Sequence, residues 1–473
     1  MEGKRYFFIG AGGIGMANLV RYFLSKGCAV AGYDRVRSEL SSRLEEEGAQ
    51  IIYEDNPALI PSPFLDKEHT EVIYTPAIHA DNLIFSFFRD TNFEMHKRAW
   101  VLGEITRSMK GICVAGSHGK TTTSSMIAWI LAQTKKGCDA FLGGILKNID
   151  SNFIITPNAE FAVIEADEYD RSFHQLSPYI AIITSADPDH LDIYGDETHY
   201  LEAFSEFTSL IKPGGALILH EGVKVTPCLQ PGVRLISYSG LLSNHGNESK
   251  EVADWRAENV KFGNGELIFD IAGPEGYRIE KISLDVPVAV NIDNAVAAGA
   301  AAYLAGATKE EIRKGLETFS GPKRRFEILL RGEADGARSI LIDDYAHSPA
   351  EIEASIKSIR QLFPDKKISV VFQPHLYTRT RDFAEEFAEA LDNADNIFLT
   401  EIYPARELPI PGVSSSIIIE KMKKGAELIE RKHLLKKIKI TNFEILITLG
   451  AADLDTLLPD IIEILKQDVE AGA

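Results

Sequence analysis

The sequence has little of several features that would each indicate a particular class of protein. Only 4 of its 473 residues are cysteine, and none forms a Cys-x-x-Cys pair, so neither a disulfide framework nor a cysteine-ligated zinc site is predicted. No apolar run approaches the roughly 18 residues that a membrane-spanning helix needs. The N-terminus also lacks an apolar signal core followed by a small-residue cleavage site. We therefore expect a cytoplasmic protein without membrane insertion.

Basic residues are also in short supply. The chain has 50 Lys and Arg against 69 Asp and Glu, a formal net charge of -19. Such a surface repels a phosphate backbone, which argues against nucleic-acid binding as the main role. Any polyanionic ligand must therefore be met by local cations. The remaining composition, 45% hydrophobic and 25% charged, is typical of a globular protein, and the length suggests about three domains.

The pattern along the chain predicts an α/β protein of three domains. Short apolar runs alternate with helical patterns over residues 1–107, which predicts a Rossmann-like domain with a parallel sheet. Residues 108–320 open with a strand, a glycine turn and an amphipathic helix, which predicts a P-loop ATPase-type parallel sheet. Short β-like pieces from about 213 to 290 suggest an antiparallel edge to that sheet. The alternation resumes over residues 321–473 and predicts a second Rossmann-like domain.

The first motif with a chemical meaning is a glycine loop that follows the first strand. It reads Gly10-Ala11-Gly12-Gly13-Ile14-Gly15, and Asp34 ends the next strand. Glycines allow a tight turn and a close approach of the backbone, and the helix N-terminus offers amide hydrogens to a diphosphate. Taken alone the motif indicates NAD or FAD, while a βα turn without a ligand is the alternative. The loop predicts a diphosphate ligand without specifying the nucleotide.

A second loop, Gly116-Ser117-His118-Gly119-Lys120-Thr121-Thr122-Thr123, lies between a strand and an amphipathic helix. Val114 replaces the leading glycine of the usual phosphate-loop pattern, but the Gly-Lys-Thr core remains. Backbone amides and Lys120 can hold the β and γ phosphates, while the Thr121 hydroxyl binds Mg²⁺. A chance match in a surface turn is the alternative, and the strand–turn–helix setting argues against it.

Carboxylates and a histidine follow the next two strands of this unit. The run Glu165-Ala166-Asp167-Glu168-Tyr169-Asp170 ends a fully apolar strand, and His190 follows the next strand within Asp187-Pro188-Asp189-His190. Ligands of doubly wound sheets gather at this edge, and carboxylates there can hold the Mg²⁺ that bridges nucleotide phosphates. We expect metal binding by at least one of them, Glu168 above the rest, and His190 makes a second metal plausible.

Clustered cations and histidines mark the strand ends of the third unit. They occur in Lys323-Arg324-Arg325-Phe326, in Asp343-Asp344-Tyr345-Ala346-His347 and in the run from Gln373 to Arg381. Guanidinium groups bind carboxylates or phosphates bidentately, so such loops can recognise an amino-acid carboxylate or stabilise phosphate charge. Solvated basic loops paired with the acidic surface are the alternative.

The three units together resemble the Mur ligase family across essentially the whole chain. The match rests on both glycine loops, on Glu165-Ala166-Asp167-Glu168, Asp189-His190-Leu191-Asp192, Asn291 with Asn294, Arg324-Arg325-Phe326, Asp344-Tyr345-Ala346-His347 and His375-Leu376-Tyr377-Thr378-Arg379-Thr380. Within the family, Met16 after the first glycine loop, Ile402-Tyr403-Pro404-Ala405-Arg406-Glu407 and Gly412-Val413-Ser414 are most similar to the members that use L-alanine.

The resemblance implies an ATP-dependent ligase that activates UDP-N-acetylmuramate as an acyl phosphate and joins it to L-alanine. Mg²⁺ is the implied metal, and Mn²⁺ can replace it. The implied UDP-binding residues are Gly10, Gly12, Gly13, Ile14, Gly15 and Asp34. The implied ATP-binding residues are Gly116, Ser117, His118, Gly119, Lys120, Thr121 and Thr122, with Asn291 and Asn294 at the adenine, Asp343 at the ribose and Arg325 near the phosphates.

The remaining implied roles concern the metal and the amino acid. Metal binding falls to Thr121, Glu168 and His190, and the amino-acid pocket to Tyr345, His347, His375 and Arg379. Lys120 and Arg379 belong to the catalytic set. The attacking amine must lose a proton, and His347 or His375 is the candidate base, because the intrinsic pKa of histidine suits that task.

Three departures from the family pattern stand out. Val290 replaces a histidine that many members carry before the adenine-contacting asparagine, and Ala452 makes the usual Gly-Ala-Gly-Asp read Gly-Ala-Ala-Asp. Phe204 stands where several related ligases carry a carbamylated lysine, so none is predicted here.

Three other functions stay open at this point. A wall-recycling ligase of the same family would join a tripeptide to UDP-N-acetylmuramate by the same chemistry. An NAD-dependent oxidoreductase would use the first glycine loop and leave the second without a role. A binding protein could use the central ATPase as a nucleotide switch. The sequence does not decide between monomer and homodimer.

Overall fold

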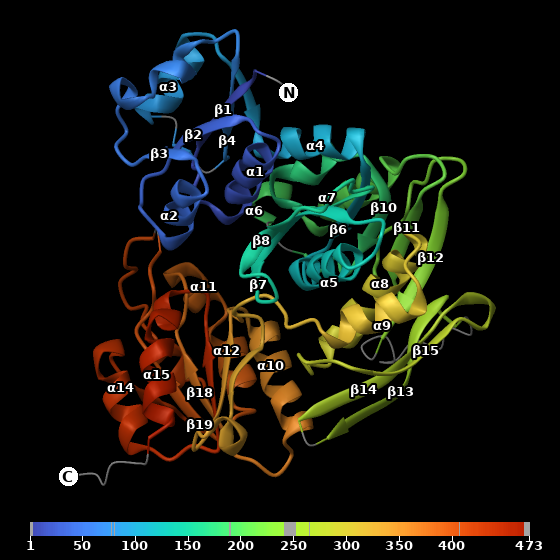
Figure 1. The fold of residues 1–473 in the computed structure, drawn as a ribbon. Helices are drawn as coiled ribbons and strands as arrows, with labels where there is room; N and C mark the ends of the chain where they lie inside the picture. Colours follow the sequence, from blue (N-terminus) through green and yellow to red (C-terminus); the bar gives the residue numbers. More distant parts are fainter. Residues whose placement is uncertain are drawn as a thin grey trace. The chain divides into compact units, whose positions relative to one another are not determined.

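The computed structural model describes residues 3–76, 78–79, 81–188, 191–240, 252–263, 265–405 and 407–467. These residues form two compact units (Figure 1). Unit 1 comprises Met1–Glu258, Asp270–Ile282 and Ile292–Ser320, and unit 2 comprises Asn259–Phe269, Ser283–Asn291 and Gly321–Ala473. The boundaries 1–107, 108–320 and 321–473 stay predictions, because this division into units does not test them.

The N-terminal sheet of unit 1 is parallel, as the alternating pattern predicted. Its strand order is β3-β2-β1-β4-β5. Side chains of β1 alternate between two buried clusters, Phe8 on one face and Phe7 with Ile9 on the other, because both faces of a parallel sheet are covered. The elements are β1 Arg5–Ile9, α1 Ile14–Ser25, β2 Ala29–Tyr33, α2 Glu39–Glu46, β3 Gln50–Ile52, β4 Thr70–Tyr74, α3 Leu83–Asp90, β5 Glu94–Lys97 and α4 Arg98–Ser108.

The central sheet has ten strands in the order β15-β14-β13-β12-β11-β10-β6-β9-β7-β8. Its centre, β10-β6-β9-β7, is parallel, and β8 pairs antiparallel with β7 at one edge. The strands are β6 Lys110–Ala115, β7 Cys138–Leu146, β8 Ser151–Ile154, β9 Phe161–Glu165, β10 Pro178–Ile183, β11 Ala216–His220, β12 Arg234–Ser239, β13 Trp255–Gly263, β14 Glu266–Ala272 and β15 Arg278–Ser283. The helices are α5 Lys120–Ala132, α6 Leu191–Tyr194, α7 Glu197–Ser209, α8 Val290–Leu304 and α9 Lys309–Glu317.

One detail of the central sheet corrects the sequence prediction. We expected the whole stretch from 213 to 290 to be antiparallel, yet β11 and β12 pair parallel, as do β12 and β13. Only the later strands, β13 to β15, follow each other with connections too short for a parallel crossover. The turn signals between these strands predicted breaks in the chain but could not give strand direction.

The C-terminal sheet, in unit 2, has the order β16-β17-β21-β18-β19-β20. It is parallel except for β16, which pairs antiparallel with β17 and was not predicted. The elements are β16 Glu327–Arg331, β17 Ile340–Asp344, α10 Pro349–Leu362, β18 Ile368–Phe372, α11 Tyr377–Asp382, α12 Ala384–Leu391, β19 Asn396–Leu399, α13 Ser416–Ile419, β20 Glu427–Leu428, α14 Arg431–Ile440, β21 Ile445–Leu449 and α15 Leu458–Leu465.

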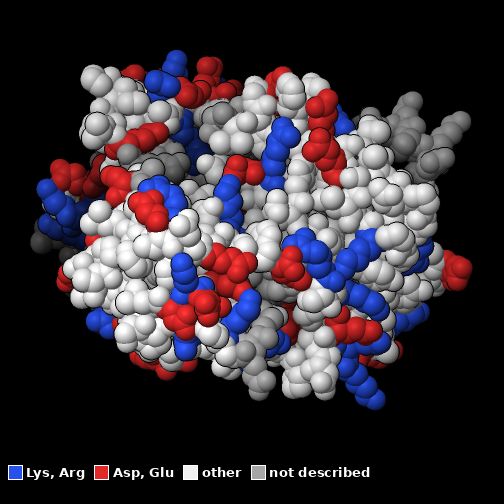
Figure 2. Space-filling model, turned by 90° about the horizontal axis from the view of Figure 1, so that it is seen from above, with Lys and Arg blue, Asp and Glu red and all other residues white. Residues whose placement is uncertain are grey.

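The surface carries charged side chains of both signs. On the face drawn in Figure 2, acidic and basic side chains are interspersed. Among the helices of the described residues, none combines the length and the apolar character needed to cross a membrane.

Candidate active site

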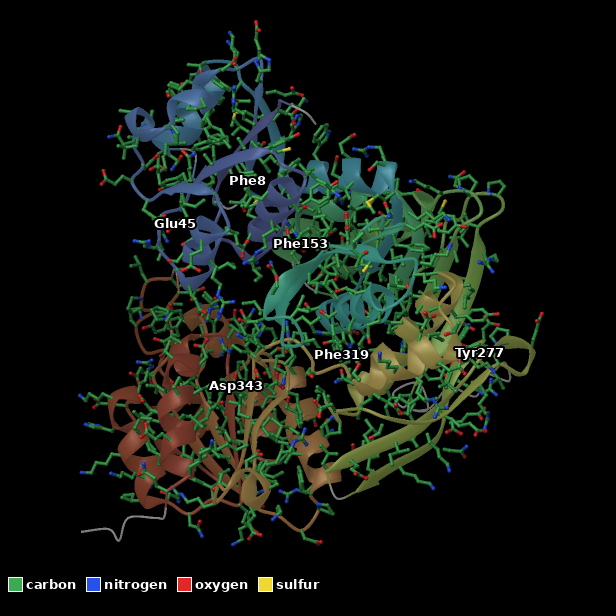
Figure 3. The ribbon with its side chains drawn as sticks, viewed as in Figure 1. Phe8, Glu45, Phe153, Tyr277, Phe319 and Asp343 are labelled. Atoms are coloured by element: carbon green, nitrogen blue, oxygen red, sulfur yellow. The ribbon has the colours of Figure 1, made fainter. Side chains whose placement is uncertain are left out.

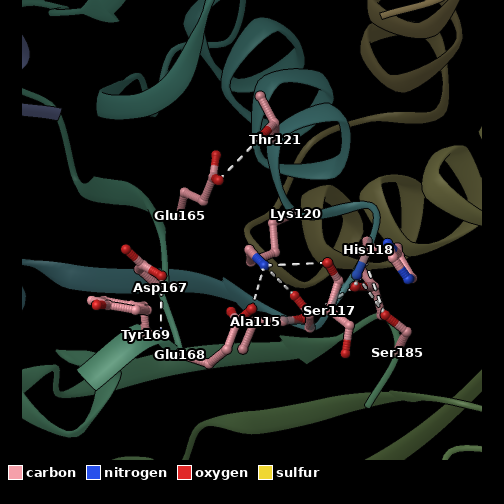
Figure 4. Close-up of polar contacts among 12 residues, drawn as sticks. Ala115, Ser117, His118, Lys120, Thr121, Glu165, Asp167, Glu168, Tyr169 and Ser185 are labelled. Carbon is pink, nitrogen blue, oxygen red and sulfur yellow. Dashed lines mark hydrogen bonds and ion pairs between the residues drawn. The ribbon is translucent and has the colours of Figure 1, made fainter. Parts of the chain in front are cut away.

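The loop between β6 and α5 has the backbone of a phosphate-binding loop (Figure 4). Gly119 precedes α5 with φ 82°, a left-handed conformation that favours glycine. The next strand end holds the loop from the side: the His118 amide donates to Ser185 Oγ at 2.8 Å, and the Thr184 hydroxyl donates to the His118 carbonyl. Ser117 Oγ donates to the Asp187 carbonyl at 2.6 Å. The loop is therefore shaped before any ligand arrives.

Lys120, the first residue of α5, points back over this loop. Its ammonium group lies 2.8 Å from Glu168 Oε1 and also donates to the Gly116 carbonyl. The Glu168 side chain is only 2% exposed, and burial raises its pKa, although the Lys120 charge opposes the shift. Its second oxygen, Oε2, is buried without a hydrogen-bond partner among the described residues. A charged pair is thus held beside the loop, with one acceptor left over.

Thr121 contacts a carboxylate that the sequence did not single out. Its hydroxyl donates to Glu165 Oε1 at 3.0 Å (Figure 4). Glu165 Oε2 accepts from the Gly143 amide at 3.1 Å. The sequence favours Glu168 within the acidic run, and its metal-binding role stays a prediction. Strand pairing explains the placement, because Glu165 ends β9 opposite Val114 of β6, next to the loop. The register of neighbouring strands was the missing signal.

These oxygens suit a hard divalent cation. Mg²⁺ is usually held by one or two carboxylates together with phosphate oxygens, and the Thr121 hydroxyl, Glu165 and the unpartnered Glu168 oxygen are donors of that kind. The described residues contain no group of three or more His, Cys, Asp or Glu side chains able to hold a metal by themselves. His190, the other predicted metal ligand, lies outside the described residues.

Helix α8 supports the phosphate loop from the other side. Asn294 accepts a 3.0 Å hydrogen bond from the Thr123 hydroxyl, and the same Asn294 oxygen would lie 2.8 Å from a Cβ on Gly119. Nearby, Asp293 accepts from the Gly240 amide at 2.7 Å and lies 3.0 Å from His220. Asn291, the other residue of the predicted adenine pair, donates to the Val286 carbonyl at 3.0 Å.

The first glycine loop has partners of a different kind. Asp34 accepts from the Gly12 amide at 2.7 Å and from the Val36 amide at 3.1 Å. Arg98, at the start of α4, donates to the Gly15 carbonyl at 2.9 Å, and burial lowers its pKa despite the nearby acidic Asp167 and Glu165. Arg98 belongs to none of the predicted motifs, because it stands 83 residues from its partner. This loop offers helix-start amides with one arginine behind them.

In unit 2 the predicted amino-acid residues collect where β17 and β18 end. The His347 ring lies 6.4 Å from the His375 ring, centroid to centroid, and 5.3 Å from that of Tyr345. Its Nδ1 donates to the Tyr345 carbonyl at 3.0 Å, which leaves Nε2 as the nitrogen with a free lone pair. Burial lowers the pKa of His347, opposed by the Glu351 carboxylate and assisted by the charge of Arg379, and this shift favours the neutral ring.

The two arginines of the basic cluster differ in their surroundings. Arg324 is held by the Gly450 and Ala452 carbonyls, at 2.6 and 3.1 Å, and by Asp343 at 3.3 Å. Both guanidinium groups lie 5.2 Å from the ring centre of Tyr345. Arg324 therefore ties the strand ends together, while Arg325 packs on an aromatic face of the predicted pocket.

Asp343 and Asp344 are both buried at the end of β17. Asp343 (labelled in Figure 3) accepts from Thr448 Oγ1 at 2.6 Å and pairs with Arg324, and burial raises its pKa. Burial raises the pKa of Asp344 to about 6, opposed by a hydrogen bond from Ser355. The ribose contact of Asp343 stays a prediction. In this state its carboxylate already has partners within unit 2.

Comparisons with known proteins match the chain along most of its length. Residues 5–110 match the Mur ligase family, catalytic domain; residues 114–302 the Mur ligase middle domain; and residues 324–451 the Mur ligase, glutamate ligase domain. A UDP-N-acetylmuramate–L-alanine ligase of Phocaeicola vulgatus is 50% identical over 466 residues, 98% of each chain. One from Parabacteroides distasonis is 50% identical over 464 residues, 98% of this chain and 97% of the relative.

Solved structures of Mur ligases are similar to this chain in fold. A UDP-N-acetylmuramate-alanine ligase from Thermotoga maritima has a TM-score of 0.79 and 26% identity, covering 97% of this chain and 98% of its own. A murein peptide ligase from Psychrobacter arcticus shares the fold, with a TM-score of 0.66 at 19% identity over 99% and 100% of the two chains. By its sequence, its three-domain α/β fold and these matches, the chain belongs to the Mur ligase family.

Proposed function

We propose that the chain is an ATP-dependent ligase that forms an amide bond between UDP-N-acetylmuramate and L-alanine, in the synthesis of peptidoglycan precursors. The observation that carries the proposal is the phosphate loop with its two carboxylate contacts, Lys120 to Glu168 and Thr121 to Glu165. The chain that contains this loop is 50% identical, over 98% of both lengths, to a protein named UDP-N-acetylmuramate–L-alanine ligase.

The first half-reaction transfers the γ phosphoryl group of ATP to the carboxylate of the UDP-sugar. The carboxylate oxygen attacks the γ phosphorus, the bond to the β-phosphate oxygen breaks, and an acyl phosphate and ADP result. Lys120 moves from Glu168 to the phosphates and stabilises the charge that develops there. The Gly116–Thr122 loop binds the phosphates through its amides, and Arg325 is the arginine assigned to them.

Thr121, Glu165 and Glu168, with His190, are the residues that hold Mg²⁺ in this proposal. When bound, Mg²⁺ neutralises negative charge on the phosphates, and Mn²⁺ supplies the same chemistry. Asn291 and Asn294 bind the adenine and Asp343 the ribose, while Gly10, Gly12, Gly13, Ile14, Gly15 and Asp34 bind the UDP portion of the sugar nucleotide.

In the second half-reaction the amine of L-alanine attacks the activated carbonyl, and phosphate leaves. Arg379 pairs with the carboxylate of the amino acid, and Tyr345 and His375 line its pocket. His347 Nε2 accepts a proton from the ammonium group, because Nδ1 is committed to the Tyr345 carbonyl and the lowered pKa keeps the ring neutral. His375 is the alternative base.

The cytoplasm is the proposed location, since ATP and the nucleotide sugar are both substrates. Nucleic acid has no part in the reaction. Whether one chain or a homodimer performs it does not alter the residues assigned above.

Phosphate release from Mg·ATP in the presence of UDP-N-acetylmuramate tests the proposal. L-Alanine, glycine, L-serine and the wall tripeptide are added separately, and we expect turnover mainly with L-alanine. Turnover with the tripeptide alone would assign the chain to the recycling reaction, and no release with any acceptor would overturn the ligase assignment. A saturable change in NADH fluorescence on titration with the protein would instead support the oxidoreductase, and phosphate release without an acceptor would support the nucleotide switch.

A further inference from the structure

Asn152, on β8 of the central sheet, reaches the start of the helix that follows the first glycine loop. Its side chain is fully buried. Nδ2 donates to the Ile14 carbonyl at 2.5 Å, and Oδ1 accepts from Arg21 Nη1 at 2.6 Å. The amide orientation is unambiguous, because a guanidinium group can only donate and a backbone carbonyl can only accept. Ile14 is the first residue of α1, directly after Gly13.

Helix α1 meets the β7–β8 hairpin through a line of buried polar groups, which we call the polar seam: the Ile14 carbonyl, Asn18, Arg21 and Asn152. The three residues of α1 are spaced i, i+4 and i+7 and so share one helix face. Asn18 donates to the Leu142 carbonyl of β7 at 3.4 Å. Arg21, 9% exposed, also pairs with Glu47 through two nitrogens, at closest 2.8 Å. Asn18, Arg21 and Asn152 each make at least one directional hydrogen bond, while Asn18 Oδ1 is buried without a partner among the described residues.

Apolar packing surrounds the seam and supplies much of the adhesion. The Tyr22 ring lies 5.4 Å from that of Phe141, which lies 5.5 Å from that of Phe153. Burying polar groups in such a surface gains little stability over apolar residues of similar volume. What hydrogen bonds add is direction, since each works only within a narrow range of distance and angle. The seam thus fixes where the first turn of α1 lies.

We propose that Asn152 is a positioning residue for the UDP-sugar site, acting from the central sheet on the glycine loop of the N-terminal sheet. The inference rests on the proposed function, in which the loop amides bind the UDP portion. By holding the Ile14 carbonyl, Asn152 keeps the amides of the first turn aimed at the diphosphate. Without it, the folded protein binds the UDP-sugar less tightly but treats ATP and L-alanine as before.

Asn152→Asp is the sharpest test. Aspartate keeps an acceptor for Arg21 but replaces the donor that faces the Ile14 carbonyl with an oxygen, so two acceptors then oppose each other. We expect KM and Kd for UDP-N-acetylmuramate to rise about tenfold, the size of one lost buried hydrogen bond. We expect kcat and the KM values for ATP and L-alanine to stay within about twofold. If Asn152→Asp does not fold, Asn152→Leu is measured in the same way.

Asp139→Asn is the matched control. Asp139 is 1% exposed on β7 and pairs at 3.3 Å with Lys26 at the other end of α1, far from the glycine loop. The Asp139→Asn substitution weakens the junction between α1 and the β7–β8 hairpin without touching the loop. We therefore expect a lower melting temperature with an unchanged KM for the UDP-sugar. Equal KM values for wild type and the Asn152 variant would overturn the inference. A wild-type protein that does not bind UDP-N-acetylmuramate would overturn the proposed function itself.

Discussion

The chain contains two glycine loops that look alike in sequence and differ in what surrounds them. Each follows a buried strand and opens a helix, α1 after Gly13 and α5 after Gly119. At the phosphate loop, the Lys120 ammonium group donates to the Glu168 carboxylate and the Thr121 hydroxyl donates to the Glu165 carboxylate. At the glycine loop, the Asp34 carboxylate accepts from the Gly12 amide. Arg98 and Asn152 donate to the Gly15 and Ile14 carbonyls.

This difference separates binding from chemistry. Amides at a helix start are enough to hold a diphosphate. Transfer of a phosphoryl group also needs a positive charge that can stabilise the transition state, and in the proposed reaction Lys120 of the phosphate loop supplies it. We therefore expect changes in the phosphate loop to lower kcat and changes around the glycine loop to raise KM for the UDP-sugar. Four predictions test that division, from the largest expected effect to the smallest.

Lys120→Met is expected to lower kcat on the order of 1000-fold, because the developing phosphate charge loses its cation. Titration should show the affinity for UDP-N-acetylmuramate unchanged. The substitution leaves Glu168 buried without its counter-ion, which is destabilising. Lys120→Met combined with Glu168→Gln restores neutrality and should be equally inactive. Near-normal turnover in the double variant would contradict the assignment of catalysis to the phosphate loop and of binding to the glycine loop.

Thr121→Val and Glu165→Gln are each expected to lower kcat on the order of 100-fold, with partial recovery at high Mg²⁺, since each removes an oxygen donor of the proposed metal site. Turnover is measured against Mg²⁺ concentration. Glu160→Gln changes a half-buried carboxylate ahead of β9 that pairs with Lys110, so it is the control and should leave the Mg²⁺ dependence unchanged. A variant with lower kcat but an unshifted Mg²⁺ requirement would exclude its residue from the metal set.

Much of this contrast was visible in the sequence. The glycine spacing, the strand before each loop and the Gly-Lys-Thr core are local features, and all describe the loops correctly. The sequence also predicted that carboxylates would gather near Thr121. It favoured Glu168 and could not identify the contact of Glu165 with the Thr121 hydroxyl. That contact depends on the register of β9 against β6, and register is set by contacts across the sheet.

The residues around the glycine loop were harder to predict. Arg98 and Asn152 donate to loop carbonyls 83 and 138 residues away, and neither belongs to a motif. The direction of β11 and β12 and the added strand β16 were missed for a similar reason, because turn signals mark where strands end and not which neighbours they choose. Long-range geometry, rather than composition, separates the two loops.

Glu168→Gln should change the pH dependence of turnover, because Glu168 is a titratable group at the phosphate loop. Burial raises the pKa of Glu168 above its ordinary value of 4.5, so its carboxyl group keeps a proton to higher pH than an exposed glutamate does. Turnover that requires the carboxylate is therefore lost as pH falls through this raised pKa. We expect Glu168→Gln to lower kcat about tenfold at neutral pH and to lose that acid limb. An unchanged acid limb would assign it to another group.

Gly13→Ala is the smallest expected change and tests the glycine loop most directly. A Cβ at Gly13 would find its nearest neighbour, the Gly10 carbonyl, at 3.5 Å, an ordinary contact, so the folded protein has room for it. A Cβ at Gly12 would instead lie 2.9 Å from Asp34 Oδ2 and disturb the loop itself. A methyl group at position 13 therefore conflicts only with a ligand that approaches the loop closely.

If the diphosphate lies against this loop, Gly13→Ala keeps its melting temperature and raises KM for UDP-N-acetylmuramate about fivefold, through one weakened amide contact. Gly12→Ala should raise KM and also lower the melting temperature. KM for ATP should stay constant in both, because the phosphate loop is untouched. A Gly13→Ala enzyme with wild-type KM would mean that the diphosphate binds elsewhere, and the resemblance between the two loops would then be one of fold alone.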